Sequence, residues 1–583
     1  MDYSLLADAY RKLSETSKRL EKTAIIAEFL TSVPDDDLEA ATLLLQGRVF
    51  PKWDKRTLGV SSKLAAKAIA TTTGASEKEV HDLWRKHGDL GKVSELLLSK
   101  KKQATLFTKT LTLKEVMMTL RKLPEVEGMG SVTKKLQFIS SLVSAAKPED
   151  AKYILGTVLE ALRLGIAEGT LRDAIAWSFL ETPVKDGQII DEKREEYNKI
   201  VNVVQAAYDR CSDFAQVAHA AKKGGIGELK TITFVIGTPV RVMLAQREAT
   251  VASALERVSK PCALEYKYDG FRMQIHKDGD TVRIFTRRLE EVTIQFPEVV
   301  AYAKKYVAAK TALLDGEAVG FDKKTGKYTP FQAISQRIRR KYDIDEISKK
   351  LPIELCLFDI LYLDGEEVLD KPFVERRKLL RTALPEDHDK EIRLSQYLET
   401  ADEAEGEAFY KEALAAGNEG VMAKNLQGPY KPGARVGHMV KVKPTLETVD
   451  LVIVAAEWGE GKRSGWFTSF TLACYDPIED EFLTIGKVGT GLKELDNEDP
   501  EVVTFDKLTK LLQDDVITET GRKVTVKPRI VIEVKSEEIQ QSPTYEAGFA
   551  LRFPRVVRLR EDRSPDSATD IEEVRLAFKQ QKH

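Results

Sequence analysis

A glycine-rich break near residue 225 constrains the fold of this chain more than any other single feature. Before the break, apolar residues recur at helical spacing, as in residues 5–13, a pattern typical of amphipathic helices. The segment Gly224-Gly225-Ile226-Gly227 interrupts this pattern, because glycine is a poor helix former and favours turns. Strand-like and helix-like segments alternate after it. The sequence therefore predicts an all-α region followed by a region of mixed strands and helices.

A second boundary follows the mixed region. The run Leu451-Val452-Ile453-Val454-Ala455-Ala456 is apolar and rich in β-branched residues, and short strand-like segments separated by turns continue to about Arg560. This pattern suits a small β-barrel. We predict three domains in a multidomain α+β chain: residues 1–225, which are helical, residues 226–444, which are α/β, and residues 445–583, which are β-rich.

Length and composition limit the class of protein. The 583 residues are enough for three or four domains. The four cysteines stand too far apart for a zinc site and are too few for a disulfide framework, so we expect an intracellular, cytoplasmic location, nucleoid-associated if the source is prokaryotic. No basic and apolar leader opens the chain, and no apolar run approaches about 18 residues. Neither secretion nor a membrane span is expected.

Lys267 is the candidate nucleophile. It stands in Glu265-Tyr266-Lys267-Tyr268-Asp269-Gly270, with Arg272 two residues beyond. A free lysine is protonated at neutral pH, with an ordinary pKa of about 10.4, but partial burial or neighbouring cations can supply the neutral amine. Asp269 is placed to orient that amine, and Gly270 lets the backbone approach a ligand. A lysine in a surface hairpin is the alternative for this motif taken alone.

Five further motifs follow in order along the chain. Each sets charged residues in or beside an apolar, β-prone run, which is the arrangement expected of side chains delivered from strand ends into a cleft. They are Phe285-Thr286-Arg287-Arg288, Leu313-Leu314-Asp315-Gly316-Glu317-Ala318-Val319, Phe358-Asp359-Ile360-Leu361-Tyr362, Glu419-Gly420-Val421-Met422-Ala423-Lys424 and Lys441-Val442-Lys443-Pro444.

With Arg552-Phe553-Pro554-Arg555, Arg558 and Arg560, the series resembles the ordered motifs of the covalent nucleotidyltransferases, most closely ATP-dependent DNA ligases of the archaeal and eukaryotic replicative type. The resemblance covers essentially the whole chain. It implies a helical DNA-binding domain, a nucleotidyltransferase (adenylation) domain and a C-terminal OB-fold. It further implies that the protein acts in DNA replication, repair and recombination.

The reaction implied by the resemblance seals nicks in duplex DNA. Lys267 attacks the α-phosphate of ATP, AMP passes from this lysine to the 5'-phosphate of the nick, and a 3'-hydroxyl displaces AMP. Every step moves negative charge, so catalysis should depend on positioning, cations and Mg²⁺.

The resemblance also assigns side chains to the adenine base. Glu265 lies two residues before Lys267, on the same side of a strand, and is placed near the amino group of adenine. Phe358 would stack on one face of the base and Met422 would pack on the other. Judged by residue type alone, the aromatic ring and the methionine suit core packing equally well.

Charged side chains are assigned to the rest of the nucleotide. Arg272 would contact the ribose or the phosphates and Arg287 the phosphates, because a guanidinium offers forked donors and stays charged. Glu317 and Glu419 would hold the ribose and a Mg²⁺ ion, which prefers oxygen ligands. Isolated glutamates at strand ends are otherwise typical surface charges.

Lys441 and Lys443 alternate along a predicted strand, which aims both into one cleft, and by resemblance they neutralise the α-phosphate. Arg435 would be a further nucleotide contact. Arg552 and Arg555 would orient the leaving pyrophosphate when the barrel closes over the site. Two departures from the family pattern, Met439 for a frequent tryptophan and Arg563 for a frequent lysine, remove no charge.

The expected partner is nicked duplex DNA, bound by a monomer. Residues 45–51 and 163–170 resemble parts of the DNA-binding domain, where glycine-rich helix ends offer N–H groups to phosphates; simple helix capping is the alternative. The formal charge is only -2, so DNA would meet local basic groups such as Lys100-Lys101-Lys102, Arg337 to Lys341, Arg376-Arg377-Lys378 and Arg552 to Arg560. Each group alone is equally typical of a solvated face.

A possible second partner is a sliding clamp. Gln103-Ala104-Thr105-Leu106-Phe107 resembles a short clamp-binding peptide, in which Gln103, Leu106 and Phe107 would dock in a groove. Chance or a buried helix end explains this segment equally well.

Other functions remain to be weighed. An RNA ligase or an mRNA-capping guanylyltransferase uses the same lysine chemistry, but a helical region of about 225 residues ahead of the lysine fits a DNA clamp better. An NAD-dependent ligase is disfavoured because a four-cysteine zinc site is missing. A catalytically inactive DNA-binding scaffold would not need Lys267, Glu317, Glu419, Lys441 and Lys443 together.

Overall fold

The computed structural model describes residues 1–583 except 101–109, 163, 186, 330, 339–341, 434, 445–447, 495–501 and 582–583. The side chains of residues 332, 333, 335, 435, 436, 462 and 580 also lie outside the described part. The chain separates into two compact units, residues 1–84 with 90–443, and residues 444–583 with 85–89. The first unit contains a helical domain and an α/β domain.

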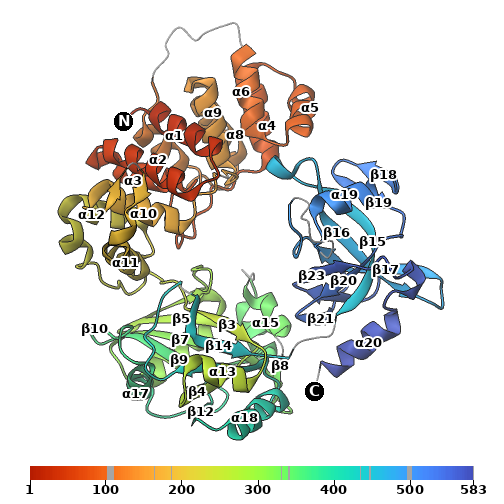
Figure 1. Ribbon diagram of the computed structural model, residues 1–583. Helices are drawn as coiled ribbons and strands as arrows, with labels where there is room; N and C mark the ends of the chain where they lie inside the picture. The colour runs from red at the N-terminus through yellow and green to blue at the C-terminus, as the bar shows by residue number, and fades with distance from the viewer. Residues whose placement is uncertain are drawn as a thin grey trace. The chain divides into compact units, whose positions relative to one another are not determined.

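Helices form almost all of the N-terminal domain (Figure 1). Their bounds are α1 Tyr3–Glu15, α2 Arg19–Ser32, α3 Asp35–Leu45, α4 Ser62–Thr73, α5 Glu77–His87, α6 Leu90–Lys100, α7 Leu113–Arg121, α8 Ser131–Ala145, α9 Pro148–Val158, α10 Glu168–Phe179, α11 Arg194–Cys211 and α12 Phe214–Leu229. A short hairpin of β1 (Val184–Lys185) and β2 (Gln188–Ile189) lies between α10 and α11. One continuous cluster of buried apolar side chains, from Tyr3 to Ile232, packs these helices together.

The predicted glycine break is a kink inside α12. Gly224 has φ −149° and ψ 18°, and Gly225 has φ 58° and ψ −140°, so neither residue is helical. Glycine tolerates the positive φ at the second of these positions because it has no Cβ. Helical structure resumes and ends at Leu229. The domain bounds 1–225, 226–444 and 445–583 stay predictions.

The α/β domain contains two sheets. The first has the order β10-β9-β7-β5-β6, with β8 beside β7 and β11 beside β9, and the second has the order β12-β4-β13-β14-β3. The strands are β3 Leu244–Glu248, β4 Cys262–Lys267, β5 Phe271–Asp278, β6 Thr281–Thr286, β7 Thr311–Phe321, β8 Tyr328–Thr329, β9 Ile353–Leu363, β10 Glu366–Glu367, β11 Ile392–Leu394, β12 Tyr397–Thr400, β13 Gly420–Asn425 and β14 Arg435–Val442.

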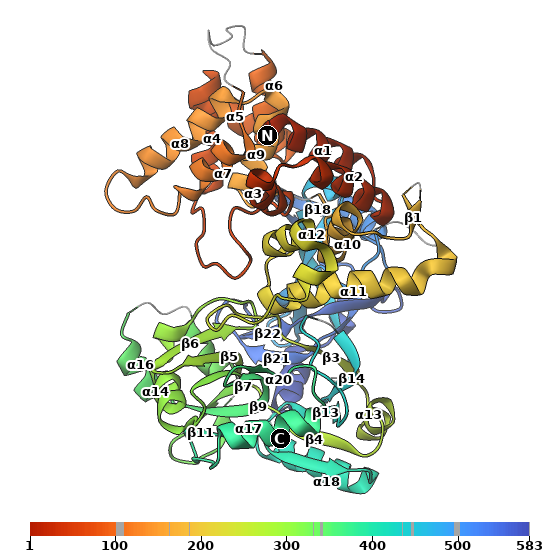
Figure 2. The same cartoon turned by 90° about the vertical axis from the view of Figure 1, so that its left-hand side faces the viewer.

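Six helices accompany these sheets in the described residues: α13 Val251–Val258, α14 Pro297–Tyr306, α15 Phe331–Ile338, α16 Ile344–Lys350, α17 Phe373–Ala383 and α18 Glu403–Ala415. Apolar residues from β5, β7 and β9, among them Ile275, Leu314 and Leu357, form one buried cluster. A separate cluster joins the second sheet to α13 and α18. Figure 2 shows α18 beside β4 and β13.

Strand register brings the sequence motifs together. In the second sheet, β4 runs antiparallel to β13 and sets Lys267 opposite Gly420 and Glu265 opposite Met422. In the first sheet, β5 runs antiparallel to β7 and sets Arg272 opposite Glu317. Because opposite residues in an antiparallel pair lie within about 5.5 Å at Cα, motifs that are distant in sequence become neighbours.

The C-terminal unit is rich in strands. Its main sheet has the order β17-β16-β15-β19-β18, with β20 pairing β15 and β23, and β21 and β22 form a separate pair. The strands are β15 Val449–Trp458, β16 Phe467–Asp476, β17 Glu481–Val488, β18 Val516–Thr520, β19 Lys523–Val526, β20 Val531–Lys535, β21 Glu538–Gln541, β22 Phe549–Arg552 and β23 Arg555–Leu559. Helices α19 (Phe505–Gln513) and α20 (Ile571–Gln580) pack against this apolar core. The OB-fold assignment of this domain stays a prediction.

Two general features bear on the predicted class of protein. The cysteines Cys211, Cys262, Cys356 and Cys474 are all buried and free. Within the ranges that the structure describes, no helix has both the length and the apolar character needed to cross a bilayer.

Candidate active site

Lys267 is held at the end of β4 by the carboxylate of Glu419, the residue directly before the neighbouring strand β13. Its Nζ forms an ion pair with Oε2 of Glu419, and the Glu419 backbone N–H donates to the Lys267 carbonyl at 2.8 Å. The Nζ of Lys443 lies 3.9 Å from the same Oε2. Burial raises the pKa of Glu419, but the positive charges of Lys267 and Lys443 outweigh burial and set this pKa below its ordinary value. The carboxylate therefore holds two lysines.

Asp269 and Gly270 shape the turn that follows Lys267. Oδ2 of Asp269 accepts a hydrogen bond from the N–H of Phe331, at the start of α15, at 3.2 Å. A Cβ at Gly270 would lie 2.5 Å from the carbonyl oxygen of Ala318 and 2.8 Å from Cγ of Glu317. The close approach predicted at this glycine is thus made to strand β7, which carries the next motif.

Glu317 is a partly buried residue whose carboxyl has a strongly perturbed pKa. Burial raises its pKa to about 8, the charges of Lys267 and Arg272 act in the opposite direction, and Glu419 and Asp315 raise it further. These interactions place Glu317 in the same electrostatic neighbourhood as Lys267.

Glu317 and Glu419 provide the carboxylate oxygens that Mg²⁺ prefers. A bound cation would also favour the charged form of Glu317, since a nearby positive charge lowers a carboxyl pKa. The residues therefore fit a Mg²⁺ ion.

Arg272 is locked by a network of buried groups. Its Nε and Nη2 lie 3.0 Å and 2.6 Å from Oδ1 and Oδ2 of Asp315, and its Nη1 donates to the carbonyl of Met243 at 3.1 Å. The hydroxyl of Tyr430 donates to Oδ2 of Asp315 at 2.7 Å and accepts from Nη2 of Arg272 at 3.2 Å. The guanidinium carbon lies 5.2 Å from the ring centroid of Phe358. One face of Phe358 is thus bordered by a fixed cation.

Glu265 is paired with two cations. Its Oε1 accepts from Nη1 of Arg377 at 2.8 Å, and its Oε2 lies 2.5 Å from Nζ of Lys424. Lys424 Nζ is also 5.0 Å from the ring centroid of Phe358. Glu265 and Phe358 are therefore linked through one lysine.

Sequence reasoning missed Arg377, Lys424, Asp315 and Tyr430. The signal for Lys424 and Asp315 was available, because each lies two residues from a predicted site residue, Met422 and Glu317, on a strand. No local pattern points to Arg377 or Tyr430 as a neighbour of the site.

Other predicted residues lie as follows. Met422 is partly buried and packs with Tyr430 and Met439, and it is opposite Lys441 across β13 and β14. Arg287 is exposed directly after β6. The backbone of Arg435 begins β14, but its side chain lies outside the described residues. Of the predicted residues whose side chains the structure describes here, Met422 is packed and Arg287 is exposed.

Comparison with known families covers most of the chain. Residues 2–176 match the family described as "DNA ligase N terminus", residues 242–443 "ATP dependent DNA ligase domain", and residues 463–563 "ATP dependent DNA ligase C terminal region". The chain belongs to the ATP-dependent DNA ligases. The predicted fold class, with a helical domain, an adenylation domain and a strand-rich C-terminal domain, is confirmed.

Relatives of similar length support this membership. The DNA ligase of Nanoarchaeum equitans is 47% identical over 582 residues, covering 100% of this chain and 99% of that protein. The DNA ligase of Thermococcus fumicolans is 44% identical over 574 residues, 98% of each. A solved structure named "Pmar-Lig_PreS3" is similar in fold, with a TM-score of 0.56 and 16% identity over 95% of this chain and 99% of that one.

The protein is a DNA ligase that uses ATP. The RNA ligase or capping enzyme that the sequence left open is not favoured, and a DNA-binding scaffold without activity is set aside because the chain is an enzyme.

The two segments that resemble the DNA-binding part of these ligases meet in the helical domain. A cavity of about 210 Å³ is lined by Gln46, Arg48, Lys52, Ile166, Ala167, Glu168 and Leu171. Gly47 has φ +67° and Gly165 has φ +64°, and Nζ of Lys22 donates to the carbonyl of Leu164 at 2.5 Å. Described residues of both segments therefore line one cavity.

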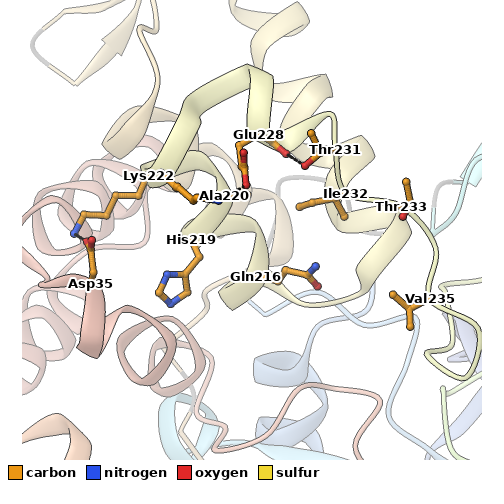
Figure 3. Close-up of a pocket in the computed structure, with 11 residues that line it drawn as sticks. Asp35, Gln216, His219, Ala220, Lys222, Glu228, Thr231, Ile232, Thr233 and Val235 are labelled. Atoms are coloured by element: carbon orange, nitrogen blue, oxygen red, sulfur yellow. Dashed lines mark hydrogen bonds and ion pairs between the residues drawn. The ribbon is translucent and has the colours of Figure 1, made fainter.

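The helical domain also holds a larger cavity that none of the predicted residues lines. It has a volume of about 660 Å³ and is lined by residues of α12, by residues of the segment after it up to Val235, and by Asp35 of α3. Figure 3 shows Lys222 turned toward Asp35, and their charged atoms lie 2.6 Å apart. The lining of the cavity includes Lys223 and Glu228, on either side of the glycine kink, and includes none of the residues described at the Lys267 site.

Arg337 and Arg376, each predicted as part of a basic surface group, are buried instead, whereas Lys378 of the second group is exposed. The side chain of Arg337 is 0% exposed and pairs with Glu298 at 2.5 Å, and that of Arg376 is 1% exposed and pairs with Asp359 at 2.7 Å. Buried carboxylates on other elements compensate these charges. Arg339, Arg340 and Lys341 lie outside the described residues.

The predicted C-terminal arginines belong to the second unit. Arg552 ends β22, and its Nη1 donates to Glu538 at 2.8 Å. Arg555 begins β23 and is exposed. Between them, Phe553 is 68% exposed with φ +50°, a conformation that is uncommon outside glycine.

Proposed function

We propose that Lys267 is the nucleophile of this ligase and that it carries AMP to nicked duplex DNA. One observation supports the proposal most directly: Lys267 and Lys443 both lie near the same carboxylate oxygen, Oε2 of Glu419. An amine at this point has a cation on one side and two acidic residues, Glu317 and Glu419, beside it. Lys267 and Lys443 bring positive charge to the point where a phosphate anion would meet the amine.

In this resting arrangement Lys267 is an ammonium ion paired with Glu419. An ammonium has no lone pair for attack, so Lys267 must separate from Glu419 and release a proton to solvent, which nearby positive charge favours. The neutral amine then attacks the α-phosphate and pyrophosphate leaves. Because the pKa of Glu419 is below its ordinary value, this carboxylate holds the ammonium rather than removing its proton. Lys441 and Lys443 supply positive charge for the α-phosphate that approaches.

Glu317 and Glu419 would hold Mg²⁺, which supplies Lewis-acid stabilisation of phosphoryl charge when bound. Arg272, fixed by Asp315, would contact the ribose or the phosphates. Arg287 would contact the phosphates, including the 5'-phosphate of the nick, and Arg435 would be a further nucleotide contact. Arg552 and Arg555 would orient the leaving pyrophosphate. These assignments follow the family motifs.

The base end of the site consists of Glu265, Phe358 and Met422. Glu265 accepts a hydrogen bond from the amino group of adenine in this proposal, Phe358 stacks on the ring, and Met422 packs on the opposite face. Support comes from register, since Glu265 and Met422 are opposite each other across β4 and β13.

The test follows label from nucleotide to DNA. The protein is incubated with α-labelled ATP or GTP and Mg²⁺, separated under denaturing conditions, and chased with nicked DNA. Label from ATP should stay on the protein and then move to DNA, and Lys267→Ala should abolish labelling while nick binding persists. Lys260→Ala, which removes a surface lysine paired with Glu403 at 2.9 Å, is the matched control. Ligation by Lys267→Ala would contradict the mechanism.

We infer a monomer that works inside the cell in replication, repair and recombination. A sliding clamp is a proposed partner through Gln103, Leu106 and Phe107, which lie outside the described residues. If Phe107→Ala leaves clamp binding and clamp-stimulated ligation unchanged, this partner is ruled out.

A further inference from the structure

Two consecutive arginines of α17 reach two acidic residues on different sheets. Arg376 binds Asp359 of β9 through Nε at 2.7 Å and Nη2 at 3.1 Å. Arg377 binds Glu265 of β4 through Nη1 at 2.8 Å. Asp359 directly follows Phe358, so α17 is tied both to the strand that carries the proposed stacking ring and to the strand that carries the proposed base acceptor.

Arg377 is itself held in one orientation. Its Nη2 donates to the carbonyl of Ser395 at 2.7 Å, and its guanidinium carbon lies 4.9 Å from the ring centroid of Tyr397. Tyr397 is opposite Glu265 across β12 and β4. The planar fork of a guanidinium fixes the direction of each hydrogen bond that it donates. Arg377 therefore fixes Oε1 of Glu265 relative to β12 and to Ser395, which lies just before β12.

The second oxygen of Glu265 has a different partner, because Oε2 lies 2.5 Å from Nζ of Lys424. Each carboxylate oxygen can accept about two hydrogen bonds. One partner on each oxygen orients the group and still leaves acceptor capacity for a ligand. Rotation of the Glu265 carboxylate would break both ion pairs. Because Glu265 is only 1% exposed, water could not readily replace the lost partners.

We propose that Arg377 is a positioning residue for base recognition, which orients Glu265 toward the exocyclic amine of the bound purine and thereby sets selectivity among purine nucleotides. The proposal rests on the proposed role of Glu265. Arg377 does not contact Lys267 or its partner Glu419 in the recorded ion pairs of the described residues. Its loss should therefore change which nucleotide is used more than how fast a bound nucleotide reacts.

The substitutions Arg377→Met and Arg377→Lys test this role. Methionine keeps an unbranched apolar chain and removes both hydrogen bonds, whereas lysine keeps the charge but cannot bind Glu265 and the Ser395 carbonyl through one rigid plane. Lys424 still pairs with Glu265 in both variants, so the buried carboxylate is not left without a countercharge. Thermal unfolding records whether each variant is folded.

The control is Arg381→Met on the same helix. Arg381 binds Asp387 at 3.1 Å, and its side chain is 45% exposed. The Arg381→Met substitution removes an arginine ion pair from α17 and leaves the partners of Glu265 unchanged.

The assay compares ATP with purine riboside triphosphate, which lacks the exocyclic amine. Formation of labelled lysyl-AMP, or of its purine analogue, gives kcat and KM for each nucleotide. The unsubstituted protein should prefer ATP by roughly tenfold or more in kcat/KM, the value of one hydrogen bond to a charged group. Arg377→Met should reduce the preference to roughly threefold or less, mainly through KM for ATP. Arg377→Lys should be intermediate, and Arg381→Met should keep the full preference.

Two further variants separate the role of Glu265 from that of Arg377. They are Glu265→Gln alone and Glu265→Gln combined with Arg377→Met. If Glu265→Gln keeps the full preference for ATP, the base-reading role of Glu265 is wrong. If Glu265→Gln loses the preference but both Arg377 variants keep it, the positioning role of Arg377 is wrong. Positioning through Glu265 predicts that the two substitutions are strongly non-additive. The positioning role would also be overturned if the Arg377 substitutions slowed the reaction equally with both nucleotides and if their effects added to that of Glu265→Gln in the double variant. Should Arg377→Met fail to fold, the preference of Arg377→Lys decides.

Discussion

Arg272 and Asp315 form a two-bond ion pair inside the α/β domain, with Asp315 completely buried and Tyr430 bound to both partners. The pair joins β5 to β7, where Arg272 is directly opposite Glu317 and Asp315 lies two residues before Glu317 on β7. A buried charge pair of this kind contributes little net stability unless its remaining hydrogen bonds are satisfied. The hydroxyl of Tyr430 supplies one of them, so that this single group supports both the fold and the proposed ribose contact.

Tyr430→Phe removes that hydroxyl and little else. The change leaves Asp315 with one hydrogen bond fewer and also removes the acceptor for the N–H of Met243, 3.1 Å away. We expect a loss of about 1 to 3 kcal/mol in unfolding free energy, measured by urea unfolding, and slower lysyl-AMP formation. Tyr397→Phe is the control, because its hydroxyl binds the exposed Glu399. Equal effects of the two changes would contradict the supporting role of Tyr430.

Stability in the absence of Mg²⁺ should depend on the protonation of Glu317. The pKa of Glu317 is about 8 in the folded protein, against an ordinary value of 4.5, so between these values the folded state binds more protons than the unfolded state. The contribution of Glu317 is then fully present below about pH 4.5 and is lost as the pH rises toward 8. The melting temperature measured across this range should fall less in Glu317→Gln than in the unsubstituted protein.

Mg²⁺ should reverse part of this loss. A cation competes with the proton for Glu317, so the rise in melting temperature caused by Mg²⁺ should grow as the pH increases toward 8. Glu375→Gln, which changes an exposed carboxylate of α17, is the control and should retain the Mg²⁺ effect. A Mg²⁺ effect that is independent of pH, or that persists unchanged in Glu317→Gln, would argue against Glu317 as a ligand.

Gly270→Ala should disturb the contact between the Lys267 turn and β7. The added Cβ would lie 2.5 Å from the Ala318 carbonyl oxygen, so the backbone must shift, at a cost of about 1 to 3 kcal/mol. Adenylation should slow as well, because Cγ of Glu317 is the next atom in the way, at 2.8 Å. Gly227→Ala has no atom within 4 Å of its new Cβ and should be tolerated. Normal unfolding and activity of Gly270→Ala would show that this close approach is not required.

Asp450→Asn should weaken the C-terminal unit. Oδ2 of Asp450 binds Arg560 at 2.6 Å and Arg563 at 3.2 Å, and the Asp450 side chain is 9% exposed. Loss of the charge leaves two arginines without this partner. We expect the free energy of unfolding of this unit to fall by about 3 kcal/mol, which is typical of a broken buried pair.

Calorimetry should show this effect as a lower unfolding temperature for the C-terminal unit. The control is Asp562→Asn, which removes the more exposed carboxylate bound to the same Arg560, and it should change that temperature less. A larger effect of Asp562→Asn would contradict a stabilising role for Asp450.

Local patterns were enough to predict several features of this ligase. Alternation along a strand placed Glu265 and Lys267 on one side of β4, and the order of the motifs indicated the family to which the chain belongs. The break at Gly224 and Gly225 was identified because glycine has a strong local effect on the backbone. All of these are short-range properties, which depend on neighbouring residues and on residue type.

The tertiary structure decided which charges became partners. The run Arg376-Arg377-Lys378 is typical of a solvated surface, yet Arg376 is buried against Asp359, and Arg377 binds Glu265, 112 residues away in the chain. Likewise, only the register of β5 and β7 sets Arg272 opposite Glu317. Such pairs depend on strand register and on where a helix docks, and both are determined by packing over the whole domain. The sequence alone therefore determined the family and the residue types of the site, while long-range packing determined which of them meet.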